Sequence, residues 1–386
     1  MTIYFWPTLQ IIAYARLAQA ILYTFNLEIL KRRFILHMSV YPTYSKAIEE
    51  KVNQRSLPPA VQKKLVGVIT SLAWEIYNWF ECHGHFFEYN SFDLRNKLHW
   101  FSCGLIDRQQ TAQNFILDVD LNIRERFHLA RKYCLEDDMQ MLWRNMSADN
   151  RFQETYRLSR NGTIEIWEPT IYRNEHLNWE ELFNERPFFF FRNYLGMRNY
   201  FERLEDSKSR YKCFYFALKC KRVHNFDLYS CLLQIDANDE LIDVLTNLPD
   251  LQFSKALQIF LHWPFQDMFL DLVTDFQDHI NEQTFYDLVQ FILVEKLDCC
   301  QDHPYEELFA EFWNLFAKRE GEYEDRVKMD ANLYNIARYV LDNSKDFDRG
   351  KYSCFIEEYL NRISVPRIPC TFSCDFRDFD YSDFDE

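Results

Sequence analysis

The sequence predicts an all-α fold of stacked antiparallel helix pairs, an irregular α-solenoid-like arrangement in two lobes with an irregular central connector. Glycine is scarce: 7 of 386 residues, against roughly 7% in an average protein, so the left-handed turns of tight hairpins and phosphate loops have few places. The 36 Phe, 23 Tyr and 9 Trp residues provide large surfaces for helix packing. Apolar side chains also recur at spacings of three and four residues along most of the chain.

The apolar stretch at residues 3–30 is predicted to be a helix of a soluble protein. Pro7 suits a first turn. In a membrane span, Arg16 would cost about 2.5–3.5 kcal/mol near the centre, and the stretch lacks the basic start and cleavage site of a signal peptide. The apolar stripe expected to face the core consists of Leu9, Ile12, Ala13, Leu17, Ala20, Ile21 and Phe25.

Two segments share a pattern. Residues 127–143 and 214–233 each begin with an aromatic residue and place an alanine three positions later, Ala130 and Ala217. Each continues into a second helix that ends in bulky apolar residues, and residues 334–338 carry a fainter copy. The alanines would allow two helix backbones to approach closely, so the pattern predicts repeated helix pairs.

Phe127-His128-Leu129-Ala130, followed by Leu142-Trp143, resembles an ankyrin repeat, in which the inner helix begins with Leu-His-x-Ala and the outer helix ends in leucines. The chain departs from that pattern where Cys134 and Lys221 stand in place of the turn glycine, and the preceding Thr-Pro is absent. The resemblance implies stacked helix pairs and a binding role, and it brings no catalytic residues.

The helical pattern is interrupted at residues 148–209. We interpret this segment as an irregular, aromatic-rich connector between an N-terminal helical lobe (1–147) and a C-terminal helical-repeat lobe (210–363). Residues 163–168 alternate like a short strand. Pro187 precedes four consecutive phenylalanines, 188–191. We expect this run to be buried, and an exposed docking patch is the alternative.

The C-terminal lobe carries the clearest helix signals. A helix over 253–261 should begin at a cap provided by Asp250 and end before Pro264. Asn281 should cap another helix, and Pro304 should precede a third with acidic residues in its first turn. Further helices are predicted over 265–280, 331–341 and 351–363.

Residues 364–386 are expected to form a flexible tail. Within it, residues 370–386 contain six acids and one arginine, a net charge of −5, among regularly spaced aromatic residues. Such a segment cannot bury enough apolar surface to fold alone. A short interaction motif is one interpretation and a merely solubilising end is the other. The candidate binding residues of the motif are Phe376, Phe379, Tyr381 and Phe384.

Charge and motifs exclude several functions. A net charge of −15 argues against nucleic acid or an anionic membrane as the main partner. The sequence contains none of the common nucleotide-binding, serine-hydrolase, zinc-protease or C-x-x-C motifs, so we expect no cofactor. Basic and aromatic residues alternate over 208–222, as they do in proteins that bind single-stranded nucleic acid. We interpret this segment as an amphipathic helix instead.

Metal binding has only thinly supported candidates, because no group of cysteines and histidines has the paired spacing of a zinc site. We therefore expect no metal and no catalytic residues. Eleven scattered cysteines are typical of reduced, buried thiols in a cytoplasmic protein. The candidate ligands are Cys82, His83 and His85, then Cys299 and Cys300 near His303, and Cys370 with Cys374.

The chain is thus predicted to be a non-enzymatic protein–protein interaction scaffold or adaptor in the cytoplasm, whose partner is an unidentified protein. The alternative is an enzyme or metal-binding protein with an unrecognised Cys/His site. A third hypothesis is an adaptor whose residues 370–386 recruit a larger assembly. The sequence does not indicate the oligomeric state.

Overall fold

The protein is described from a computed structural model that covers residues 3–25, 41–83, 97–186, 188–220, 222–235, 238–317, 321–344 and 347–363. Throughout these ranges every named element is a helix, and extended pairing is limited to an isolated bridge between Trp100 and Ile106. The all-α prediction is therefore confirmed. None of the described helices combines the length and the apolar character needed to cross a membrane.

The N-terminal helices gather around the long helix α4 (Pro59–His83), against which both α1 (Leu9–Leu22) and α3 (Tyr41–Asn53) pack. Thr8, rather than Pro7, begins α1, because its side chain accepts a hydrogen bond from the backbone N–H of Ile11. The face of α1 that is buried consists of Ile11, Ala15, Ala18, Ile21 and Leu22.

The apolar stripe predicted to face the core is largely wrong. Of its members, Ile21 is buried and Ile12 and Phe25 are half-buried. Leu9, by contrast, is 85% exposed, and Leu17 is also exposed. The helix carries aliphatic residues on more than one side, so periodicity alone does not select the packed face. In the fold the small residues Ala15 and Ala18 lie inward.

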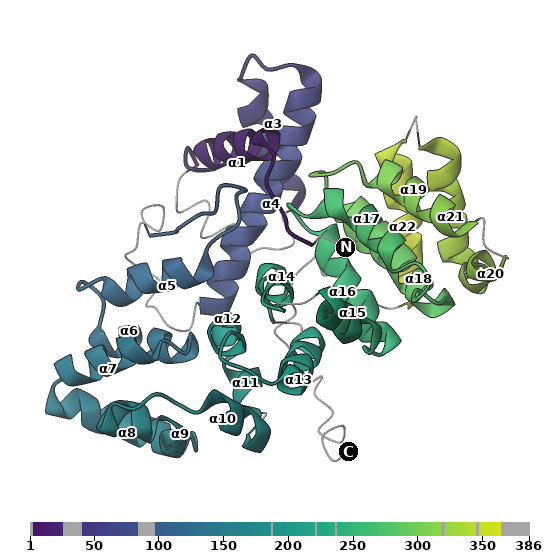
Figure 1. Cartoon of the computed structure of the whole chain (residues 1–386). Coiled ribbons are helices and arrows are strands. Elements are labelled where there is room, and N and C mark those ends of the chain that lie inside the picture. Colours follow the sequence, from purple (N-terminus) through teal and green to yellow (C-terminus); the bar gives the residue numbers. More distant parts are fainter. Residues whose placement is uncertain are drawn as a thin grey trace.

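From α4 the chain descends through one layer of helices, turns, and climbs back through a second (Figure 1). The descending elements are α5 (Arg108–Leu117), α6 (Ile123–Lys132), α7 (Glu136–Asn145), α8 (Ala148–Arg160), α9 (Ile164–Glu168) and η3 (Pro169–Arg173). The turn consists of α10 (Trp179–Glu185), α11 (Phe188–Arg192), η4 (Tyr194–Gly196) and α12 (Met197–Phe201).

The returning elements are α13 (Ser207–Lys219), α14 (Asn225–Leu233), α15 (Asn238–Thr246), α16 (Asp250–Gln258) and η5 (Ile259–Leu261). The remaining elements form the group at the right of Figure 1: η6 (Gln266–Met268), α17 (Phe269–Asp275), α18 (Glu282–Gln290), η7 (Phe291–Leu297), α19 (Tyr305–Ala317), α20 (Glu322–Lys328), α21 (Ala331–Asn343) and α22 (Arg349–Ile363).

The segment 148–209 is helical rather than irregular, and the strand predicted at 163–168 is the short helix α9. Gly162, in the left-handed region at φ +63°, ends the preceding helix. The backbone N–H of Trp167 then donates to the carbonyl of Thr163. The six residues 163–168 are too few to distinguish a period of two residues from the helical period of 3.6, so the alternation alone misled the prediction.

The predicted pair at 127–143 is the hairpin of α6 and α7, and its turn explains the missing glycine. Cys134 itself adopts a left-handed backbone, φ +56°. The N–H of Leu135 donates to the carbonyl of Ala130, and that of Cys134 to Arg131, which is the Schellman ending of a helix. In the second copy, the turn position Lys221 lies outside the described residues.

The helix signals of the C-terminal part are largely confirmed. Asn281 caps α18 by accepting a hydrogen bond from the N–H of Thr284 at 2.9 Å, and α19 carries Glu306 and Glu307 in its first turn. Asp250 lies inside the first turn of α16 and its side chain makes no capping bond, because Pro249 occupies the cap position. The helix predicted over 265–280 is shorter, since α17 ends at Asp275.

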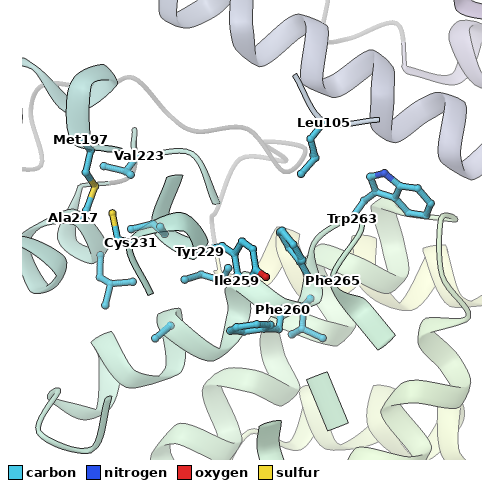
Figure 2. Close-up of a cluster of buried hydrophobic side chains, with 14 of the residues drawn as sticks. Leu105, Met197, Ala217, Val223, Tyr229, Cys231, Ile259, Phe260, Trp263 and Phe265 are labelled. Atoms are coloured by element: carbon cyan, nitrogen blue, oxygen red, sulfur yellow. The ribbon is translucent and has the colours of Figure 1, made fainter. Parts of the chain in front are cut away.

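Residues far apart in the sequence pack together around Tyr229 of α14 (Figure 2). Tyr229 accepts a hydrogen bond from the N–H of Phe5 at 2.7 Å and donates to the carbonyl of Ile3. Its ring packs against Phe265, and Trp263 donates to the carbonyl of Cys103 at 2.9 Å. The described core residues, from Ile3 to Leu360, form one hydrophobic cluster. The division into two lobes stays a prediction.

Candidate functional site

Cys82 and His83 lie in the last turn of α4 and are buried, whereas His85 lies outside the described residues. The ring of His83 stacks on Trp79 at a centroid distance of 4.2 Å. Its Nδ1 contacts the carbonyl oxygen of Trp79, and its Nε2 shares a hydrogen bond with the Tyr133 hydroxyl at 2.8 Å. Both ring nitrogens are therefore engaged by the core.

The second candidate group is Cys299, Cys300 and His303. Cys299 and Cys300 are half-buried after η7, while Nδ1 of His303 lies 3.7 Å from a carboxylate oxygen of Asp267. In the part of the chain that the structure describes, no three His, Cys, Asp or Glu residues are grouped as metal ligands. Cys370, Cys374, Phe376, Phe379, Tyr381 and Phe384 lie outside the described residues.

A cluster of buried charges joins α4, α5 and α14, and sequence analysis missed it because its members lie as far apart as Glu75 and Asp227. Nε2 of His224 donates to a carboxylate oxygen of Glu75 at 2.6 Å, and the N–H of Ile106 donates to the other at 3.4 Å. Arg108 and Asp227 complete the cluster, and all four charged side chains are buried.

The pKa values in this cluster follow from burial and charge. Burial opposes ionisation of Glu75, but the charges of His224 and Arg108 and the hydrogen bonds outweigh it and lower its pKa. For Asp227 burial dominates, and its pKa is raised. Because these side chains are buried and Glu75 is bonded to His224, the cluster holds α4 and α14 together rather than presenting groups to a substrate.

A small hollow of about 10 Å³ lies between the turn elements and α13. Its lining is aromatic and sulfur-containing, and we call it the aromatic pocket: Phe183, Phe190, Phe191, Tyr194, Tyr200, Cys213, Phe216, Ala217, Cys220 and Val223. Phe189 and Phe190 are buried, which confirms burial for these two members of the phenylalanine run. Phe191, Tyr194 and Phe216 are half-buried.

Cys213 and Cys220 do not make the aromatic pocket reactive. Burial raises the pKa of both thiols, so each is protonated at neutral pH and is a poor nucleophile. The two buried thiols therefore do not support nucleophilic chemistry in this pocket.

Cations border the aromatic pocket. The Arg222 guanidinium lies over the ring of Tyr194, and Lys219 over that of Tyr215. Arg192 is exposed directly after Phe191, and its carbonyl accepts a hydrogen bond from Lys132 at 2.5 Å. Burial, together with the neighbouring charges of Arg131 and Arg192, lowers the pKa of Lys132 to about 8. Of the interleaved residues 208–222, those from 208 to 219 lie in the helix α13, as interpreted, and that helix also contributes to the lining of this pocket.

A second feature is a set of exposed aromatic side chains, which we call the α8 face. Phe152 is 72% exposed, Tyr156 is 64% exposed, and Tyr172 is 53% exposed. Phe152 and Tyr156 are four residues apart and lie on the same side of α8. The Tyr172 hydroxyl bonds that of Thr155 at 2.9 Å, and its ring meets Trp143 edge-on.

Comparison of the chain with protein-family models, curated proteins and solved structures finds no match.

Proposed function

We propose that this chain is a protein–protein interaction scaffold or adaptor, and that the α8 face binds its partner. The cytoplasm is the compartment that fits, because the described cysteines are free thiols. This proposal uses the helical body as a rigid support and assigns it no catalytic role.

The exposed aromatic residues of the α8 face are the observation that carries the proposal. Grouped aromatic side chains exposed to water on a helix are unfavourable unless another surface covers them. Tyrosine and phenylalanine are also typical of the centres of protein interfaces. Arg151 bonds the carbonyls of Trp143 and Arg144, which fixes α8 against α7.

The test compares the proteins captured by the native chain and by the double variant Phe152→Gln/Tyr156→Gln, using proximity labelling in the cells that express the chain. Glutamine preserves helix propensity and removes the apolar rings. We expect one or more labelled proteins to be lost, with a Tm within about 2 °C of the native value because surface changes alter stability by less than about 0.5 kcal/mol.

The matched control is Leu117→Gln/Met329→Gln, which changes two exposed apolar residues elsewhere and should leave the labelled set intact. If the α8 variant labels the same proteins as this control, the α8 face does not bind a partner.

A further inference from the structure

We propose that the outward side of α1 binds a second copy of this chain, so that two protomers form a symmetric, antiparallel helix pair. This interface is distinct from the α8 face and does not depend on it. We call the four residues on this side of the helix, all of them exposed, the α1 outer face: Leu9, Ala13, Leu17 and Ala20.

Apolar residues lie on two opposite sides of α1. The inner side, which includes Ala15 and Ala18, is buried where the helix packs against α4. The residues of the α1 outer face are spaced by three and four positions, which places them in one stripe along the helix. Leu9 is 85% exposed and Leu17 is 36% exposed. A continuous apolar stripe in contact with water indicates a surface that another molecule covers.

The segment before α1 extends this apolar surface. Ile3 is buried, and the ring of Phe5 packs edge-on against Phe265 at a centroid distance of 5.1 Å. The alternate residues Tyr4 and Trp6 are 59% and 82% exposed. An exposed tryptophan beside an apolar helix stripe is typical of a residue that anchors an interface.

The spacing of the apolar residues favours a second copy as the occupant. In an antiparallel pair related by a two-fold axis at Ala13, residues at equal distances on either side of this position face each other across the interface. Leu9 and Leu17, each four residues from Ala13, then pack together. Trp6 and the small Ala20, each seven residues away, also face each other. Ala13 meets its own copy, which lets the two helix backbones approach closely.

Charge also favours this pairing. The chain carries a net charge of −15, so two copies repel each other at long range. Residues 3–25 contain no acid and one cation, Arg16, and two copies can therefore approach at this stretch. The same symmetry places Arg16 opposite the uncharged Gln10, so no like charges meet.

The exposed area is sufficient for a weak dimer. Trp6 and Tyr4 contribute about 300 Å² at their exposures, since an aromatic side chain buries roughly 150–250 Å². With the leucines and alanines of the α1 outer face, each copy buries about 500 Å². Two copies thus bury about 1,000 Å², the lower limit for a specific interface. We expect a dissociation constant of about 1–100 µM.

Sedimentation velocity of the full chain, from about 1 to about 200 µM, measures this equilibrium. The average mass should rise from 47.1 kDa toward twice that value. Leu9→Glu and Leu17→Lys should each weaken dimerisation at least tenfold, because each places a charge against an apolar side chain. Their equimolar mixture should dimerise at least tenfold more tightly than either variant alone, since the antiparallel register sets the two introduced charges opposite each other.

The matched controls are Leu117→Glu and Met329→Lys, which introduce the same charges at exposed apolar positions outside α1 and should dimerise like the native chain. Melting followed by circular dichroism verifies that each variant is folded. A native chain that stays monomeric at about 200 µM, equal dimerisation by the α1 and control variants, or a mixture no tighter than its components would overturn the proposal.

A disulfide at the two-fold axis tests the register independently. In Ala13→Cys the two introduced thiols lie close enough to bond across the interface, so mild oxidation should crosslink this variant well above the native chain. Ala331→Cys, at an exposed position on α21, should show no such excess, and equal crosslinking of the two variants would contradict a two-fold axis at Ala13. A native chain that stays monomeric but binds phospholipid vesicles, with binding lost in Leu9→Glu, would assign the α1 outer face to a membrane and overturn the dimer.

Discussion

Cys134 shows how a single residue serves both chain geometry and packing. It adopts the left-handed backbone that glycine usually takes, and its thiol lies against Gly196 at the end of η4. A Cβ added at Gly196 would be 2.7 Å from this sulfur and 2.9 Å from the carbonyl carbon of Tyr133. The absence of a side chain at 196 therefore allows η4 to pack on the α6–α7 turn.

Gly196→Ala should lower the free energy of unfolding by about 1–3 kcal/mol, because an extra methyl in a packed contact forces neighbours apart. Thermal unfolding followed by circular dichroism measures the change. The control is Gly350→Ala, where the nearest atom is a side-chain oxygen of Asp348 at 3.3 Å. An unchanged Tm for Gly196→Ala would show that η4 does not pack as described.

We expect the contribution of Glu75 to the free energy of unfolding to be sensitive to acid. Its pKa is lower in the folded chain than the usual value of about 4.3, so its contribution is present above that value and is lost as pH falls through the folded pKa. The pKa of Asp227 is raised in the folded chain, so its ionisation at higher pH lowers stability, opposite to the effect of Glu75. Glu75→Gln should destabilise by about 3–5 kcal/mol at pH 7, since it leaves His224 and Arg108 without their buried partner.

Melting the native chain and Glu75→Gln between pH 7 and pH 3 measures this contribution. The difference in Tm between them should shrink as the pH falls. A constant difference in Tm across that range would mean that the ionised Glu75 carboxylate does not stabilise the cluster of buried charges.

Helix ends were easier to predict than helix faces. Pro304 and Asn281 act locally, so the starts of α18 and α19 could be read from the sequence. The packed face of α1 depends on α4, which no local pattern specifies. One side of the aromatic pocket comes from a segment that the sequence analysis identified as a helix, since Cys213, Phe216 and Ala217 of α13 line it. The opposite side, from α10 to α12, follows only from tertiary packing.

Asn281→Ala should cost about 1 kcal/mol, because the N–H of Thr284 loses its capping oxygen. Asp250→Ala should cost only about 0.3–1 kcal/mol, since Asp250 caps nothing and contributes only a favourable charge in the first turn. Chemical denaturation of the two variants compares them directly. A larger loss for Asp250→Ala would contradict the assignment of the caps.

At the scale of the molecule, contacts between distant segments unite the helices. A Cβ on Gly67 of α4 would lie 2.1 Å from the carbonyl oxygen of Gln301, so these backbones touch. The pair of Glu75 and His224 and the bond from Trp263 to Cys103 connect the same halves of the chain. These contacts unite the described helices into one continuous body.

The central claim is that the described helices form one body with a shared core, and differential scanning calorimetry of the purified chain tests it most directly. The account predicts one endotherm whose calorimetric and van't Hoff enthalpies agree, displaced as a whole to lower temperature by Glu75→Gln. Two resolved endotherms in the native chain, with only one of them moved by Glu75→Gln, would contradict it.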